Sequence, residues 1–145
     1  MNLRSLMARN LFLPAVDRYL GREVSSKLEL MEEEARRSFE ERKSRMLESL
    51  RTQLEWCATE VPYYTDLFKA VGFLPEKLGS GLEEMQKLPF LTKDIILEQG
   101  ERLLAKSLKE QVKFHCGTGG STGKKVNIKY DMHAADWSSA VTLFA

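Results

Sequence analysis

The spacing of apolar residues along this chain changes at Gln111, and that change limits the folds open to it. Before Gln111, apolar residues mostly recur three or four positions apart, which is the spacing of one buried helix face. After it, residues 111–116 and 126–130 alternate polar and apolar side chains, as strands do. A glycine-rich segment joins these two stretches. The sequence therefore predicts a mainly helical region followed by a β-hairpin.

The helical region begins with a short helix over residues 3–20, interrupted near Pro14 and ended by Gly21. One long amphipathic helix is then expected over residues 23–59, with charged side chains on its solvent face. Its apolar stripe comprises Val24, Leu28, Met31, Ala35, Phe39, Met46, Leu50, Leu54 and Cys57. A coiled-coil homodimer is the alternative, but the stripe drifts from strict heptads and Arg42 interrupts it. Packing of this helix onto a larger body is favoured.

Local start and stop signals divide the rest of the chain. Pro62 should end the long helix, and a short helix should begin at Tyr64 or Thr65 and end near Gly72. Thr92 is a suitable N-cap for an amphipathic segment that runs to about residue 105. In the same way, Asp131 should cap a last helix over residues 132–143.

Composition argues against several classes of protein, including disulfide-rich and transmembrane proteins. The 22 basic and 21 acidic residues nearly cancel, so no global field favours nucleic acid or an anionic membrane. Two cysteines, Cys57 and Cys116, are too few for a disulfide framework and lack zinc-site spacing, which favours a reducing, cytoplasmic location. The apolar stretch 11–16 is too short for a transmembrane segment or a signal peptide. Peripheral contact of this end with a membrane stays open.

The segment 117–125 is the strongest candidate for a ligand-binding loop in the sequence. It contains four glycines, three hydroxyl residues and two lysines, which suit a polyphosphate because glycine lets backbone N–H groups converge and lysine adds charge. A solvent-exposed turn has a similar composition and remains the alternative. A Walker A loop fails, because Thr118 stands at its first glycine, Lys125 follows Lys124, and a strand comes next.

Other reactive or aromatic side chains are better explained by structure than by catalysis. His115 and Cys116 should point to opposite faces of a strand, so they do not form a nucleophilic pair. His133 should lie on the surface. Tyr63 and Tyr64 are expected to anchor packing rather than to line a substrate pocket. No catalytic residue and no metal ligand is assigned.

Three ordered motifs resemble one family. T-G-G-S-T-G-K at 118–124 resembles the phosphate loop of adenylate-forming acyl-CoA synthetases. V-P-Y-Y-T-D-L-F at 61–68 and L-P-F-L-T-K-D-I at 88–95 look like the phenylacetate-CoA ligase branch, which includes CapK-like proteins, and the opening 11–22 is similar to that subgroup. The likeness covers roughly residues 10–145. One departure is Lys125, which stands where the family usually has proline.

The resemblance implies an α/β fold: an N-terminal helical region over 1–108, then the start of a nucleotide-binding core over 109–145, incomplete here. It implies activation of a small-molecule carboxylic acid with ATP and Mg²⁺ to an acyl-adenylate, followed by transfer to coenzyme A. Hydroxyl donors, a backbone cradle and one charge would hold the nucleotide phosphates. These positions are Thr118, Gly119, Gly120, Ser121, Thr122, Gly123 and Lys124.

The family's adenine, ribose and catalytic-lysine motifs would lie downstream of this loop, and none occurs before Ala145. The chain is therefore expected to be an N-terminal fragment that is inactive alone. A truncated, non-catalytic helical interaction module with a vestigial phosphate loop is the alternative. The sequence names neither the acid nor the final acyl acceptor.

Overall fold

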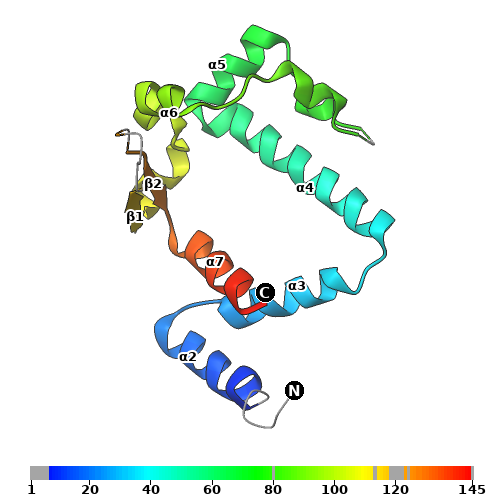
Figure 1. The fold of residues 1–145 in the computed structure, drawn as a ribbon, viewed down its shortest axis with the longest axis vertical. Helices are drawn as coiled ribbons and strands as arrows, with labels where there is room; N and C mark the ends of the chain where they lie inside the picture. The colour runs from blue at the N-terminus through cyan, green and yellow to red at the C-terminus, as the bar shows by residue number, and fades with distance from the viewer. Residues whose placement is uncertain (1–6, 80, 113, 118–122, 124, 145) are drawn as a thin grey trace. The chain divides into compact units, whose positions relative to one another are not determined.

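The structure, a computed structural model, describes residues 7–79, 81–112, 114–117, 123 and 125–144 (Figure 1). These residues are mostly helical and include a two-stranded antiparallel sheet. They fall into two compact units. The first comprises the described residues of 1–37, 112–115 and 129–145, and the second those of 38–111 and 116–128.

The first unit opens with a π-helical turn, Ala8–Phe12, that continues into helix α2, Leu13–Leu20. The expected interruption near Pro14 takes the form of this change in helix type, with Pro14 in the first α-helical turn, where its missing N–H costs nothing. Gly21 ends α2 with a left-handed φ of 64°, which confirms the predicted stop.

Helices α3, Val24–Ala35, and α7, Met132–Phe144, lie side by side and form the core of this unit (Figure 1). Their contact buries Val24, Leu28 and Ala140, with Leu13 and Met31 packed against them. The predicted cap of α7 is confirmed, because the backbone N–H of Ala134 donates to Asp131 Oδ1 over 2.8 Å.

The single helix expected over residues 23–59 is wrong. Helix α3 ends at Ala35, and α4, Phe39–Glu60, begins after Ser38. The reason is a capping box: Ser38 N donates to Glu41 Oε2 over 2.9 Å, and Glu41 N donates to Ser38 Oγ over 3.3 Å. The side chains of Ser38 and Glu41 thus accept from backbone N–H groups at the start of α4. A new helix can therefore begin here without a preceding helical turn.

The expected apolar stripe is confirmed in part, because Val24 and Leu28 are buried and Met31, Leu50 and Leu54 pack against the cores of their units. Phe39 and Met46, predicted to be buried, are 67% and 50% exposed, whereas Leu47 is buried. Successive residues of a helix lie about 100° apart, so the side of α4 that faces the core runs through Leu47, Leu50 and Leu54 and leaves Phe39 and Met46 outside it.

The second unit packs α4 against α5, Pro62–Val71. Leu47, Phe68, Phe73 and Leu78 form its buried cluster. Pro62 separates the two helices as predicted, but α5 starts at Pro62 itself rather than at Tyr64 or Thr65, since proline is favourable in a first turn. Gly72, with a φ of 62°, ends the helix near the predicted point.

Short helical turns complete the second unit: Pro75–Lys77, Glu83–Lys87, α6 at Lys93–Gln99, Gly100–Leu103 and Lys106–Gln111. The Thr92 cap is confirmed, because Ile95 N donates to Thr92 Oγ1 over 3.3 Å. The α-helix expected to run to residue 105 stops at Gln99, and Gly100, with a φ of 48°, begins a 3₁₀ turn.

The predicted hairpin is confirmed with shorter strands, β1 at Phe114–Gly117 and β2 at Asn127–Tyr130. Its open end belongs to the first unit and its loop end to the second. The expected boundary at residue 108 between a helical region and a nucleotide-binding core stays a prediction.

Two carboxylates from other parts of the chain cap the start of α3, whose own N-cap residue, Glu23, makes no side-chain cap. Glu23 N donates to Asp136 Oδ2 over 2.9 Å, and Ser25 N donates to Asp17 Oδ2 over 2.6 Å. Arg22 Nε completes the arrangement with a 2.7 Å bond to Asp136 Oδ1. Because both carboxylates are almost fully buried, their partners are needed to offset the loss of water.

Replacing the buried carboxylate should unfold the first unit more easily. Asp136→Asn removes one charge from the pair with Arg22 and should lower the free energy of unfolding by about 2 kcal/mol. The matched control is Asp66→Asn, since the Asp66–Arg102 pair is exposed on both sides and should contribute less than about 1 kcal/mol. Urea unfolding followed by Trp137 fluorescence in a Trp56→Phe background measures the loss in the first unit, and Trp56 fluorescence in a Trp137→Phe background measures the loss in the second. Equal losses in the two variants would contradict this account.

The same pair makes stability depend on pH. Burial acts to raise the pKa of Asp136, but hydrogen bonds from Arg22 and the Glu23 N–H, with the charges of Arg22 and Lys27, hold it below its usual range. A depressed folded-state pKa stabilises the fold above the ordinary carboxyl value of roughly 4, and this contribution is lost as pH falls through the folded-state pKa. The stability gap between wild type and Asp136→Asn should therefore be constant near neutrality and shrink in acid. A gap that widened in acid would reverse the sign.

Candidate functional site

The hairpin holds the two ends of the candidate phosphate loop together. At its open end, the rings of Phe114 and Tyr130 stack with centroids 5.2 Å apart and planes 21° apart. At its loop end, a Cβ built on Gly117 would lie 3.5 Å from Asn127 Oδ1. These contacts set Phe114 opposite Tyr130 and Gly117 opposite Asn127. The connection between the strands thus begins and ends at neighbouring positions.

Of the seven predicted phosphate-binding residues, the structure describes Gly123. The other six lie outside the described residues: Thr118, Gly119, Gly120, Ser121, Thr122 and Lys124. Gly123 has a φ of 80°, a left-handed backbone conformation that residues with a Cβ rarely adopt. The space around it is open, because a Cβ added there would meet no atom within 4 Å. A left-handed glycine fits a phosphate cradle, since such turns direct successive N–H groups toward an anion.

The charge of the hairpin favours an anion. By sequence, residues 113–130 include Lys113, Lys124, Lys125 and Lys129 and contain no aspartate or glutamate. Lys125, where the resembling family has proline, is exposed. In a chain whose net charge is only +1, this is a local concentration of positive charge.

The element after the loop bears on the type of phosphate site. A Walker A loop leads from a strand into a helix whose N-terminus faces the phosphates. Here the chain enters β2, and the next helix, α7, begins only at Met132. The expectation that a strand follows the loop is confirmed.

The open end of the hairpin adjoins a cavity that sequence reasoning missed. Its volume is about 330 Å³, and its lining residues are Leu20, Arg22, Phe114, Tyr130, Met132 and Ala135. Arg22 is held at this cavity by Asp136 and by a 3.1 Å bond from Nη2 to Ser139 Oγ. One signal could have indicated the arrangement: Asp136 is the sole acidic residue of the apolar segment 132–144.

The other singled-out side chains keep structural roles. Tyr64 packs against the core of the second unit, and burial, with the nearby Cys57 and Tyr63, raises its pKa. His133 is exposed, with its ring edge-on to Trp137 at 6.5 Å, as expected of a surface residue. His115 and Cys116 are both exposed and are adjacent in strand β1, where successive side chains alternate between faces.

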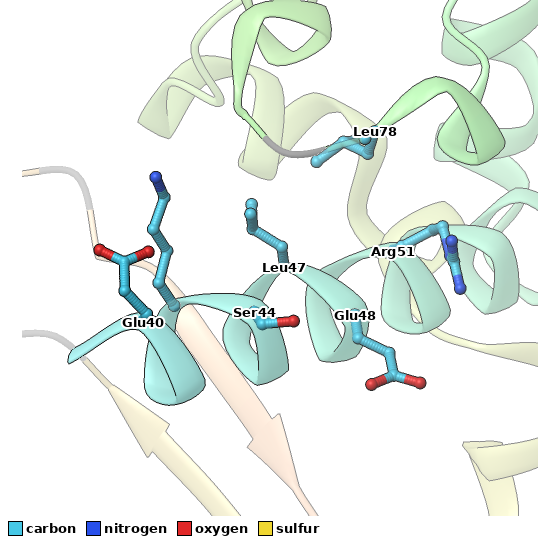
Figure 2. A pocket seen from close by; sticks show the side chains of 8 residues that line it. Glu40, Ser44, Leu47, Glu48, Arg51 and Leu78 are labelled. Atoms are coloured by element: carbon cyan, nitrogen blue, oxygen red, sulfur yellow. The ribbon is translucent and has the colours of Figure 1, made fainter. Parts of the chain in front are cut away.

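A second cavity, of about 350 Å³, lies on α4 (Figure 2). Leu47 and Leu78 face each other across it, and Glu40, Glu48, Lys43 and Arg51 surround it. Two acids and two bases give its lining no net charge. The cavity contains none of the predicted phosphate-binding residues and offers no preference for an anion.

Within the part of the chain that the structure describes, no group of three or more His, Cys, Asp or Glu side chains could hold a metal ion. No helix in that same part is both long and apolar enough to cross a membrane. Comparison of the chain with models of protein families, with curated proteins and with solved structures found no match.

The conformation of Gly123 gives a direct test of the hairpin. Gly123→Ala should cost about 1 kcal/mol, because a left-handed φ is strained once a Cβ is present, and the amides of β1 and β2 should exchange roughly fivefold faster. Gly117→Ala is the control, since its added Cβ makes only ordinary contact. Hydrogen exchange resolved by residue measures both. Equal protection in the two variants would show that the turn does not need glycine at 123.

Proposed function

We propose that this chain supplies the triphosphate-binding loop of an AMP-forming ligase of the phenylacetate-CoA ligase type. The observation that carries the proposal is the sequence T-G-G-S-T-G-K joining two antiparallel strands in a hairpin without acidic residues. The wider motif resemblance over residues 61–68 and 88–95 supports the choice of family. The substrate is a carboxylic acid, and coenzyme A is the proposed acyl acceptor.

The roles of the loop residues follow from their donors. Thr118, Ser121 and Thr122 would donate side-chain hydrogen bonds to phosphate oxygens, and the glycines 119, 120 and 123 would let the backbone approach. Lys124 would add positive charge near the terminal phosphates. Each hydrogen bond to a charged oxygen contributes roughly 1.5–3 kcal/mol, so a few suffice for specific binding.

This assignment suits the reaction because the protein must bring two anions together. ATP supplies the adenylyl group that activates the carboxylate and the pyrophosphate that leaves. The chain's part is to hold the phosphates, neutralise their charge and orient them, which is electrostatic stabilisation and positioning rather than acid–base work. Lys125 in place of proline adds one more charge to the same loop and removes a fixed φ.

Binding of phosphates to the loop is the decisive test. We expect the chain to bind MgATP in isothermal titration calorimetry and inorganic tripolyphosphate to compete, because the loop would recognise the phosphates. Ser121→Ala combined with Lys124→Ala should weaken binding about tenfold or more, since two donors to charged oxygens are lost. The matched control, Ser44→Ala with Lys69→Ala, makes the same two changes at exposed positions of α4 and α5 and should leave affinity unchanged.

Two results would overturn the proposal. Equal affinity in the two double variants would place the nucleotide elsewhere. A well-folded chain that binds neither MgATP nor tripolyphosphate would favour the alternative, a helical interaction module whose phosphate loop is vestigial.

A further inference from the structure

One side of the first helical segment is apolar and faces solvent. Leu11 is 68% exposed, Phe12 70% and Tyr19 88%. Phe12 and Tyr19 are seven positions apart, which is about two helical turns, so they share one side of the segment. Leu11, next to Phe12 and eight positions before Tyr19, falls at the edge of the same side. The opposite side packs inward through Leu13, which contacts the α3–α7 core. The segment is therefore apolar on its inner and on its outer side.

The charges of α2 are arranged unequally between these sides. Its acidic residue, Asp17, is 5% exposed and accepts hydrogen bonds from the backbone and side chain of Ser25. Its basic residue, Arg18, is exposed and adjoins Tyr19. The outer side of α2 thus presents apolar groups and positive charge without an acid.

The sequence extends this bias over the whole N-terminal segment. Residues 1–20 carry Arg4, Arg9 and Arg18 against Asp17 alone, a net charge of +2. The whole chain has a net charge of +1, so residues 21–145 have a net charge of −1. The positive charge is concentrated in the segment that exposes the apolar side chains.

We propose that the outer side of residues 7–20 docks on an anionic lipid bilayer. Leu11, Phe12 and Tyr19 enter the interface, and Arg18 pairs with anionic headgroups, as in helices that lie in the plane of a membrane. The proposed contact is peripheral, with the segment lying along the surface of the bilayer. A second copy of the chain fits less well, because a symmetric contact would set two basic segments against each other.

The test uses the 145-residue chain and two kinds of vesicle, phosphatidylcholine alone and phosphatidylcholine mixed with phosphatidylglycerol. We expect co-sedimentation with the anionic vesicles, weakened by salt because surface charges are screened. Arg18→Gln should reduce the partition coefficient on anionic vesicles about fivefold, since one basic residue near such a surface contributes roughly that factor. The same variant should not change the weak partition onto neutral vesicles.

The apolar contribution has its own matched pair. Phe12→Ser with Tyr19→Ser should lower partition onto anionic vesicles about tenfold or more, because two buried rings are lost. Phe39→Ser with Phe90→Ser also removes two exposed rings, 67% and 93% exposed, from the second unit and should change nothing. Circular dichroism checks that both variants keep their helices.

A fluorescent variant tests the membrane contact without removing any apolar group. In Tyr19→Trp, the added tryptophan emission should shift to the blue with anionic vesicles. Absence of that shift, or equal binding to neutral and anionic vesicles, would overturn the proposal. So would self-association without vesicles that Phe12→Ser with Tyr19→Ser abolishes, since a second copy would then cover this side. None of these outcomes bears on MgATP binding by the loop.

Discussion

The first unit depends on how the start of α3 satisfies its backbone N–H groups. A helix leaves its first N–H groups without partners inside the helix, and they favour negative charge. In most caps the N-cap side chain meets this need, but here Asp17 and Asp136 do so from outside the helix. One carboxylate lies on α2 and the other on α7. The requirement of one helix end therefore joins three helices.

This arrangement also holds the open end of the hairpin within the first unit. β2 ends at Tyr130, Asp131 caps α7, and Asp136 ties α7 to Arg22 and to the start of α3. The chain leaving the loop is thereby attached to a packed helix pair within six residues of the strand end. Loops that hold ligands depend on such rigid supports, because positioning groups lose effect when their scaffold moves.

Local signals in the sequence predicted most of the boundaries, and long-range contacts explain the failures. Glycine and proline stops near residues 21, 62 and 72 act through their own backbone geometry, so neighbours suffice to read them. The break at Ser38 was missed because the apolar spacing outweighed a capping box of only four residues, 38–41. The pair of Arg22 and Asp136 spans 114 positions, and no local pattern specifies such a partner. The phosphate loop stays a prediction from composition and motif; the hairpin predicted around it is confirmed, and the structure adds the left-handed turn at Gly123.

The outer side of residues 7–20 shows that the spacing of apolar residues alone does not predict which side chains are buried. Apolar spacing in a helix indicates that a side avoids water, but it does not say which body covers it. In α4 the spacing favoured a row through Phe39 and Met46, but the core of the second unit covers the neighbouring Leu47. In α2 both sides are apolar, so the spacing of apolar residues does not show which side a partner covers. The distribution of charge is then the remaining evidence. Because Asp17 is used inside the fold, the charge left facing outward is that of Arg18, and this favours an anionic surface over an apolar protein groove.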